Sequence, residues 1–383
     1  MMVKLKDICT INPKSPVLVE NLEVSFVPMP KVGEQGEFDP SEIKTYQEVK
    51  KGFTNFQNGD VLFAKITPCM ENGKGAIAKS LRNGYGFGST EFHVLRPDYS
   101  KVTSEWLYYL TSWSEFRKEA ESNMTGSAGQ KRVPKTFLEN YDVNLPELQK
   151  QKEMAEILDR IGELIALRKE QLAKLDQLVK SRFIELFGDP KDNPKGYSKK
   201  QLKDTCRVIT GNTPSRAVSE YYGDHIEWIK TDNIVSGLLN PTTATESLSE
   251  KGMAVSRTVE SGAILMACIA GSIASIGRVC VTDRKVAFNQ QINAIVPSDY
   301  NILFLYVMLQ ISKEYLVDEI NMALKGILSK SKLEEKTFYV PPIELQEQFA
   351  AFVEQTDKSK LAIQQSLDKL EMLKKSLMQE YFG

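Results

Sequence analysis

Two loops in this chain combine Lys and Arg with small polar residues. The first, TGSAGQKRVPK (125–135), holds Lys131, Arg132 and Lys135, and the second, LKGILSKSK (324–332), holds Lys325, Lys330 and Lys332. Cations neutralise phosphate charge, while hydroxyl and backbone N–H groups donate to phosphate oxygens, so this composition suits a nucleic-acid backbone. A solvated loop without a ligand has a similar composition. The recurrence of the cluster just before two long helical patterns favours a ligand.

Two polar triplets could read base edges. Ser89-Thr90-Glu91 aligns with Asn289-Gln290-Gln291, and each precedes a strand-like stretch and a proline. Asn and Gln suit adenine in the major groove, as Arg suits guanine. The same residue types also cap strands through structural hydrogen bonds, and the sequence leaves both interpretations open.

Signals of catalysis are weak. The chain has no G-x-x-x-x-G-K-[ST] loop and no Asn/Asp-Pro-Pro-aromatic element of the kind that amino-methylating enzymes use. NGYGFGS (83–89) lacks the strand-turn-helix context of a phosphate cradle and indicates a flexible loop. Only two histidines, His93 and His225, are present, and the five cysteines form no C-x-x-C pair. We therefore expect a non-catalytic chain without a metal or cofactor of its own.

Composition excludes several classes of protein. The 383 residues include 49 Lys and Arg against 50 Asp and Glu, so bulk positive charge cannot hold the chain to nucleic acid or membrane. The longest apolar run, 263–276, is shorter than the roughly 20 residues that span a bilayer. The N-terminus shows no secretory signal, and an odd set of cysteines suits reduced thiols. We expect a cytoplasmic location.

An internal repeat sets the predicted architecture. LKDIC (5–9) matches LKDTC (202–206), and LAKLDQLVKS (172–181) matches LDKLEMLKKS (367–376) at an offset of 195 residues. LQKQ (148–151) matches LQEQ (345–348) at an offset of 197, which predicts that the second copy lacks two residues between these last two matches. The chain is interpreted as two diverged copies of one unit, cut near Asp189.

The matched tails predict two long helices. Residues that are apolar except for Arg168 and Arg182 recur in steps of three and four along a seam at 157, 161, 165, 168, 172, 175, 179, 182 and 186, and at 363, 367, 370, 373, 377 and 381. About 40 residues at 1.5 Å rise give a helix of about 60 Å, which needs a partner. A two-fold repeat lets the two helices pair antiparallel, and packing of each on its own domain is the alternative.

The rest of each copy is the size of one domain and mixes strand and helix patterns. Strands are expected at 60–65, 76–79, 92–95, 263–267, 279–282 and 292–296, and helices at 104–122 and 301–318. The fold class is therefore α/β, with globular domains at 1–143 and 190–340 and helical spacers at 144–189 and 341–383. The domains differ more than the helices, which suggests one architecture with two specificities.

Four phrases carry a family resemblance. VITGNTPSRAVSEYYGDHIEWIKTDNI (208–234), GSIASIGRVCVTDRKVAFNQQINAIVP (271–297), GSTEFHVLRP (88–97) and the stretch 125–159 resemble the specificity (S) subunit of type I restriction-modification systems. The resemblance covers nearly the whole chain, although residues 12–56 contain no matching phrase. It implies a DNA reader in which two target-recognition domains each read half of a gapped target and an antiparallel coiled coil sets the gap.

The resemblance also implies partners and contact residues. The partners are double-stranded DNA, two adenine-N6 methyltransferase subunits that use S-adenosylmethionine, and two ATP- and Mg-dependent restriction/translocase subunits, with no cofactor in this chain. Polar or basic residues within the matched phrases are the predicted DNA contacts: Ser127, Gln130, Lys131, Arg132, Thr213, Ser215, Arg216, Lys230, Asn233, Lys330 and Lys332.

Two other functions compete with this one. A coiled-coil scaffold that binds proteins and not DNA would use the same helices. Such a scaffold has no need of two globular domains that differ in sequence. An enzyme that acts alone on nucleic acid would need the motifs that are missing.

Overall fold

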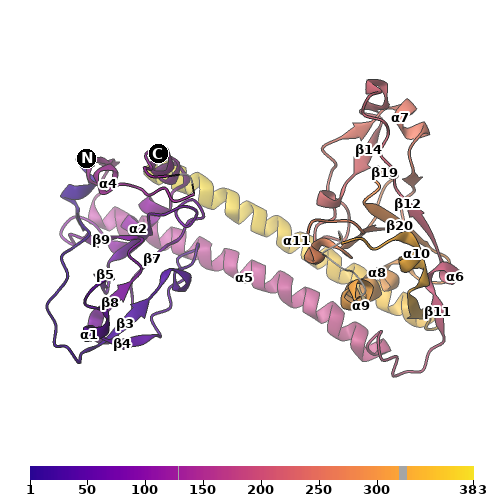
Figure 1. The fold of residues 1–383 in the computed structure, drawn as a ribbon, viewed down its shortest axis with the longest axis horizontal. Helices are drawn as coiled ribbons and strands as arrows, with labels where there is room; N and C mark the ends of the chain where they lie inside the picture. Colours follow the sequence, from indigo (N-terminus) through magenta and orange to yellow (C-terminus); the bar gives the residue numbers. More distant parts are fainter. Residues whose placement is uncertain (128, 319–325) are drawn as a thin grey trace. The chain divides into compact units, whose positions relative to one another are not determined.

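The computed structural model describes residues 1–127, 129–318 and 326–383, and the chain forms two compact units (Figure 1). Unit 1 comprises Met1–Leu167 and Leu367–Gly383, and unit 2 comprises Arg168–Ser366. Each unit contains one globular head and parts of two long helices. We call residues 1–143 head 1 and residues 190–340 head 2.

Head 1 contains ten strands and four short α-helices among the described residues. Its strands are β1 (Met2–Lys4), β2 (Cys9–Ile11), β3 (Glu23–Val27), β4 (Ile43–Thr45), β5 (Thr54–Gln57), β6 (Val61–Ala64), β7 (Gly75–Ile77), β8 (Tyr85–Gly88), β9 (Phe92–Pro97) and β10 (Asp142–Asn144). Its helices are α1 (Tyr46–Val49), α2 (Ser104–Ser112), α3 (Ser114–Ser122) and α4 (Lys135–Asn140). They form sheets in the orders β2-β9-β6-β7, β4-β3-β8-β5 and β1-β10, with β3 and β8 parallel.

Head 2 repeats this topology with one additional strand in its second sheet. Its strands are β11 (Lys199–Gln201), β12 (Cys206–Thr210), β13 (Tyr222–Gly223), β14 (Ile226–Ile229), β15 (Ser247–Leu248), β16 (Thr258–Val259), β17 (Ile264–Ala267), β18 (Val279–Val281), β19 (Val286–Phe288), β20 (Ile292–Pro297) and β21 (Thr337–Tyr339). Its helices are α6 (Leu202–Thr205), α7 (Glu250–Ala254), α8 (Ile302–Ile311), α9 (Lys313–Val317) and α10 (Lys330–Glu335). The sheets are β12-β20-β17-β18, β13-β15-β14-β19-β16 and β11-β21, with β14 and β19 parallel.

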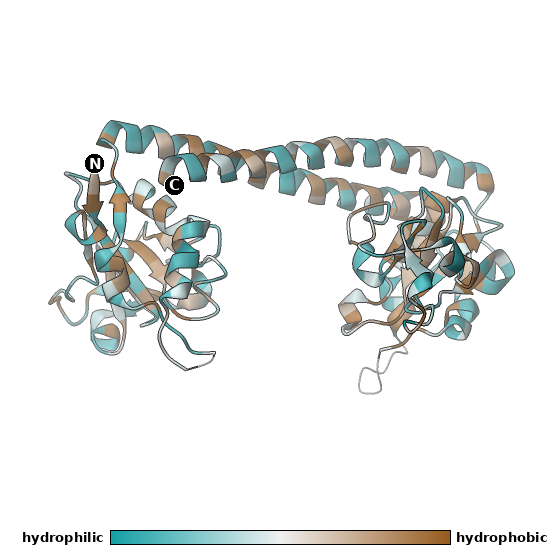
Figure 2. Ribbon diagram, turned by 90° about the horizontal axis from the view of Figure 1, so that it is seen from above, coloured by the Kyte–Doolittle hydropathy of each residue, from teal (hydrophilic) through white to brown (hydrophobic). Residues whose placement is uncertain are grey.

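Each head has three layers: short helices, the four-stranded sheet and the second sheet. The four-stranded sheet lies in the middle, so both faces of its central strands are covered. In β17, Ile264 and Met266 pack toward the helices, while Leu265 and Ala267 pack toward the second sheet. The four residues of β6 in head 1 divide in the same way between two cores. Because both faces of these strands are covered, they are continuous apolar runs without alternation, which is why the sequence predicted them. Figure 2 shows the hydrophobic strands inside each head.

All six expected strands are present, but the two expected head helices are each interrupted. The pattern at 104–122 forms α2 and α3, because Trp113 has an extended backbone with φ −65° and ψ 134°. The pattern at 301–318 forms α8 and α9, which are separated at Ser312. The two short helices of each head pack on the same core cluster, which a single straight helix would reach along only part of its length.

The long helices α5 (Leu148–Phe187) and α11 (Ile343–Phe382) have 40 residues each. In unit 1, the core of head 1 includes Leu158 from the first half of α5 and Met378 from the end of α11. In unit 2, Phe183 and Phe187 near the end of α5 lie 5.4 and 5.6 Å from the ring of Phe349 near the start of α11. The beginning of each helix therefore lies beside the end of the other within each unit, and the predicted antiparallel pairing is confirmed.

The predicted seam holds except at two positions. Ile157 is 43% exposed and Leu373 is 47% exposed, whereas Leu158 is buried and Lys374 is half-buried. The remaining seam positions are buried or half-buried. Near its start, α5 turns a wider face toward head 1 than a heptad seam requires, because Met154, Ala155 and Leu158 all enter the head core.

Two buried glutamines attach the heads to the helices. Gln151 Oε1 accepts from the Thr103 N–H at 3.0 Å, and its Nε2 donates to the Pro146 C=O at 2.9 Å. Gln346 makes the same contacts with the Asn301 N–H at 2.9 Å and the Pro341 C=O at 2.8 Å. Both side chains are at most 1% exposed.

This equivalence corrects the alignment of the two copies. Gln346, and not Gln348, is the counterpart of Gln151, so the offset is 195 residues along the whole of both helices. The helices α5 and α11, and the preceding α4 and α10, begin and end at this same offset. No residues are missing between the two anchors, and the changes in offset lie within the heads.

We predict that Gln346→Leu lowers the free energy of unfolding by about 1 to 3 kcal/mol, because the half-buried Asn301 N–H loses its acceptor and the Pro341 C=O loses its donor. The matched control is Gln348→Leu, at the exposed glutamine that the sequence match pairs with Gln151. Urea unfolding compares the three proteins. Equal losses of stability in both variants would contradict the corrected register.

Candidate nucleic-acid interface

In each head, hydrogen bonds connect three chain segments at one end of the four-stranded sheet. We call this place the junction. In head 1 the Lys65 N–H after β6 donates to the Glu91 C=O, and the Val133 N–H donates to the Lys65 C=O, both at 2.9 Å. In head 2 the Cys268 N–H donates to the Gln291 C=O at 2.8 Å, and the Leu328 N–H donates to the Cys268 C=O at 2.9 Å. At the junction, Val133 of the first predicted loop and Leu328 of the second therefore lie beside the last residue of the predicted polar triplet of the same copy.

Several described residues of the head 1 loop have hydrogen-bonded backbone groups and exposed side chains. The Gln130 N–H donates to the Ser127 C=O at 3.0 Å, and the Lys131 C=O accepts from the Thr67 N–H at 3.1 Å. The side chains of Ser127, Gln130 and Lys131 are exposed. Three of the four residues predicted in head 1 are thus placed where a ligand could reach them.

Arg132 differs because it is already paired. Its Nε and Nη2 donate to the two carboxylate oxygens of Glu91 at 2.9 and 2.8 Å. The hydrogen bonds from Arg132 hold the pKa of Glu91 below its usual range. In head 2 the backbone positions equivalent to Arg132 and Glu91 carry Ile327 and Gln291, so the two heads present different chemistry at one place.

The triplets form the same turn in both heads. Ser89 Oγ accepts from the Glu91 N–H at 3.2 Å, and Asn289 Oδ1 accepts from the Gln291 N–H at 3.1 Å. The capping interpretation therefore holds for the first residue of each triplet. The middle residues, Thr90 and Gln290, are exposed, and Thr213 donates its hydroxyl to Gln290 Oε1.

Arg216 and Lys230 of head 2 share one carboxylate. Arg216 Nη2 and Lys230 Nζ lie 2.7 and 2.9 Å from Glu246 Oε2. The Arg216 guanidinium also lies 4.4 Å from the centre of the Tyr222 ring, and Lys230 Nζ lies 5.1 Å from that of Trp228. The hydrogen bonds from Lys230 and Arg216 lower the pKa of Glu246. We call these five residues the cation cluster of head 2. No pattern in the sequence indicated a role for Glu246.

The segment that carries Arg216 is held against the aromatic rings. Tyr222 Oη donates to the Pro214 C=O at 2.8 Å, and Trp228 Nε1 donates to the Asn212 C=O at 3.3 Å. Thr213, Ser215 and Arg216 are exposed along this fixed segment. The rings of Tyr222 and Trp228 therefore hold the polar residues near the start of the segment 208–234 beside Lys230 near its end.

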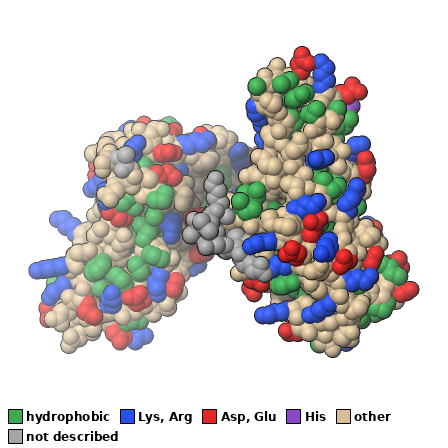
Figure 3. Space-filling model, turned by 45° about the vertical axis from the view of Figure 1, so that its right-hand side comes forward, with side chains coloured by type: hydrophobic (Ala, Val, Ile, Leu, Met, Phe, Trp, Pro, Cys, Tyr) green, Lys and Arg blue, Asp and Glu red, His purple; other side chains and the backbone are tan. Residues whose placement is uncertain are grey.

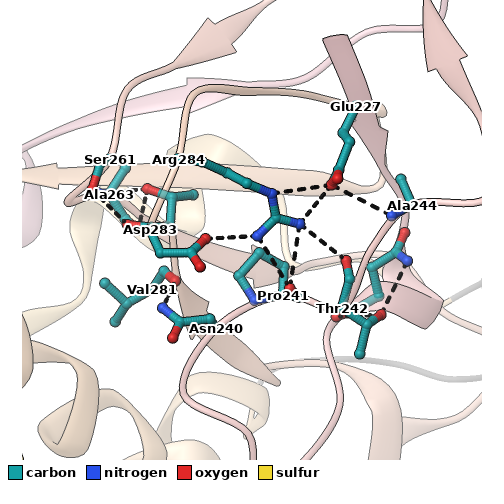
Figure 4. A network of polar contacts seen from close by, with 12 residues as sticks. Glu227, Asn240, Pro241, Thr242, Ala244, Ser261, Ala263, Val281, Asp283 and Arg284 are labelled. Carbon is teal, nitrogen blue, oxygen red and sulfur yellow. Dashed lines mark hydrogen bonds and ion pairs between the residues drawn. The ribbon is translucent and has the colours of Figure 1, made fainter. Parts of the chain in front are cut away.

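A second network positions the segment that bears Glu246, just before β15 (Figure 4). The Arg284 guanidinium binds Glu227 Oε2 at 2.5 Å and donates to the Pro241 and Thr242 C=O groups at 3.5 and 3.4 Å. The Ala244 N–H donates weakly to the same carboxylate at 3.4 Å. Residues 241–244 are thus fastened to β14 just before Glu246.

The position of Asn233 does not fit a DNA-facing role. Its side chain is 6% exposed, its Oδ1 accepts from the Lys230 N–H, and its Nδ2 donates to Thr242 and Thr243. Both ends of the amide are satisfied within the loop, so Asn233 shapes the loop and has no free group for a base.

Lys330 and Lys332 lie on α10, apart from the cation cluster. Lys330 lines a shallow depression with Lys203 and Arg207, and its Nζ lies 3.5 Å from Glu334. Lys332 is exposed. Lys203 and Arg207 were not predicted, because they lie in a short helix and a strand without a recognisable loop pattern. Lys325, part of the predicted basic cluster, lies outside the described residues.

The surface of head 2 mixes charges of both signs. On the face turned to the viewer in Figure 3, Lys and Arg side chains lie among Asp and Glu and form no continuous basic area. Among the described residues, no group of three or more His, Cys, Asp or Glu side chains could hold a metal ion. In the same part of the chain, no helix is long and apolar enough to cross a membrane.

The family model described as "Type I restriction modification DNA specificity domain" matches residues 1–177 and 194–372, and the chain belongs to this family. The "Type I restriction enzyme EcoAI specificity subunit" of Escherichia coli is 44% identical over 187 residues. That match covers 46% of this chain and 31% of the relative, so the chain spans only about a third of that relative's length.

Two solved structures share the fold. The type I restriction-modification system S subunit from M. genitalium aligns with a TM-score of 0.60 at 14% identity, covering 100% of this chain and 96% of that one. A chain from a study of "complex assembly and conformational transition of the type I R-M system" aligns with a TM-score of 0.59 at 19% identity, covering 100% and 97%. These alignments agree with the predicted architecture of two mixed α/β domains and long helices.

We predict a loss of stability in acid that depends on His93. This buried side chain donates from Nε2 to the Val133 C=O at 2.8 Å and accepts at Nδ1 from Asn12 Nδ2 at 3.0 Å, so it is neutral. Burial lowers its pKa below the ordinary 6.5. The unfolded chain therefore binds more protons below pH 6.5, and stability should fall as the pH decreases from 6.5 toward the folded pKa.

Urea unfolding at pH 7.5 and 5.5 measures this loss. The difference between the two pH values should shrink in His93→Gln and stay as in the wild type in the control His225→Gln, at an exposed histidine. An undiminished difference in His93→Gln would show that other groups cause the acid sensitivity.

Proposed function

We propose that this chain is the DNA sequence-specificity subunit of a type I restriction-modification complex, in which each head reads one half of a bipartite, gapped target. One observation carries the proposal. The two heads repeat one topology and one junction, yet they expose Arg132 with Glu91 in the first copy and Ile327 with Gln291 in the second. A shared backbone with different exposed chemistry is what two half-site readers require.

The long helices would set the separation of the half-sites. Forty residues at 1.5 Å rise give about 60 Å, slightly less than two turns of B-DNA at roughly 34 to 36 Å each. The same helices would dock the partner subunits, and exposed apolar side chains such as Leu167, Leu361 and Met372 are available on them.

The chain itself would be non-catalytic. In the proposed complex, two methyltransferase subunits use S-adenosylmethionine to methylate adenine N6, and two restriction subunits use ATP and Mg. A methyltransferase has to flip its target base out of the stack, so the heads would hold the duplex for that step. The near-zero charge of each head suggests modest affinity without these partners. A cytoplasmic location belongs to the same proposal, because the DNA lies there.

The exchange of residues 1–143 for the first head of another specificity subunit should change one half of the recognised sequence and leave the other half and the gap unchanged. Sequencing of N6-methyladenine in cells that carry the exchanged chain and the methyltransferase gives the result. A protein-binding scaffold, the competing function, would show no change of sequence.

Lys131→Gln should weaken DNA binding to all sequences and reduce the magnitude of the salt slope by about 1, because one phosphate contact is lost. Lys131 is preferable to Arg132 for this test, since loss of Arg132 would leave Glu91 without its partner. Lys118→Gln, on α3 beside Glu115, is the control for loss of one exposed charge in the same head. An unchanged affinity and slope in Lys131→Gln would remove this residue from the interface.

A further inference from the structure

Head 1 contains a cluster like the cation cluster of head 2, built from different residues. Lys31 and Lys44 share Glu42, with Nζ–Oε distances of 3.9 and 3.6 Å. Lys44 Nζ also lies 3.6 Å from the centre of the Phe26 ring. Two cations, one shared carboxylate and an aromatic ring therefore occur in both heads. Lys31 has a second acidic neighbour, Asp39, at 3.2 Å.

The two clusters occupy the same place in the fold. Phe26 pairs across the parallel ladder with Phe87, two residues before the turn at Ser89. Trp228 pairs in the same way with Ala287, two residues before the turn at Asn289. Phe26 and Trp228 are therefore equivalent positions on β3 and β14.

This recurrence is independent of sequence similarity. The strand residues that hold the two rings, VSFV (24–27) and IEWI (226–229), share no identical residue at equivalent positions. The cations also come from different places, since Arg216 precedes β13 whereas Lys44 lies within β4. Apolar neighbours are sufficient to stabilise an aromatic side chain on a sheet. Folding stability alone therefore does not explain why two cations and a carboxylate lie beside the ring in both copies.

We propose that Glu246 in head 2 and Glu42 in head 1 are specificity-determining residues that compete with DNA phosphate for the two cations beside them. The inference rests on the proposed function, because it takes duplex DNA as the ligand. Each carboxylate suppresses binding to DNA of arbitrary sequence, and the base contacts of the correct half-site supply the free energy that displaces it.

The geometry suits such an exchange. Glu246 is 38% exposed and the Arg216 side chain is more exposed still, so phosphate can approach both groups. Exposed ion pairs contribute little to stability, and phosphate offers Arg the same bidentate acceptor as a carboxylate does. The aromatic rings help to keep the cations in place while the partner changes, since a cation is attracted to the face of an aromatic ring. A carboxylate that competes with phosphate can increase the discrimination between DNA sequences without an additional contact to a base.

The test measures binding of the full chain to a 30-base-pair duplex of random sequence over a series of salt concentrations. Glu246→Gln should bind this DNA about three- to tenfold more tightly near 0.1 M salt, with a salt slope steeper by about 1 to 2, because one or two cations become free for phosphate. Glu42→Gln should act in the same direction and tests the other head independently.

Asp299→Asn is the matched control, because Asp299 is also an exposed carboxylate of head 2 paired with a lysine, Lys200, at 2.9 Å. It makes the same change of charge on the turn between β20 and α8. Equal tightening in Asp299→Asn and Glu246→Gln would indicate a general charge effect and overturn the proposal. Unchanged or weaker binding by Glu246→Gln, with an unfolding midpoint like that of the wild type, would also overturn it.

Selection from a randomised duplex library separates this inference from the proposed function. The wild type should enrich a two-part sequence, and failure to do so would overturn the proposed function and this inference with it. Glu246→Gln should enrich the same sequence with one half degraded and the other intact. A two-part sequence that is equally sharp in the variant would overturn this inference and leave the proposed function standing.

Discussion

The buried amides of Gln151 and Gln346 attach each head to the start of a long helix, and the rest of the structure depends on this attachment. Each amide satisfies a backbone N–H of the head and a backbone C=O at the helix start, and both glutamine side chains are almost completely buried. The attachment fixes the face of each head that is turned toward the helices. The attachment therefore also sets where the junction and the clusters of cations lie relative to the start of the helix in the same unit.

The sequence predicted elements well where one periodicity dominated. The six head strands and both long helices were correct, because apolar runs covered on both faces and steps of three and four leave strong patterns. Predictions failed where tertiary contacts selected among similar patterns. Leu158 and not Ile157 enters the core, and Trp113 interrupts a continuous helical pattern. The match of LQKQ to LQEQ misaligned the copies by two residues, since the hydrogen bonds of Gln346 and the bounds of the helices identify Gln346 as the counterpart of Gln151.

The exposure of most candidate DNA-contact residues was predictable from the sequence, but their contacts were not. Loop composition correctly indicated exposed residues such as Lys131, because small polar loops with cations lie at the surface. It could not distinguish Asn233, whose amide is consumed by its own loop. Nor could it find Glu246 or Glu42, because a competitor is defined by which cations lie beside it, and those come from distant segments. The equivalence of Phe26 and Trp228 follows only from strand register.

The central claim is that one pseudo-symmetric chain supplies two independent DNA specificities on one scaffold. Its most direct test is base-resolution mapping of N6-methyladenine in cells that express this chain with its neighbouring methyltransferase, compared with cells that lack only this chain. We expect a gapped, two-part methylated sequence that disappears when the chain is deleted. A methylated sequence that persists unchanged without the chain would contradict the claim and place the specificity in another subunit.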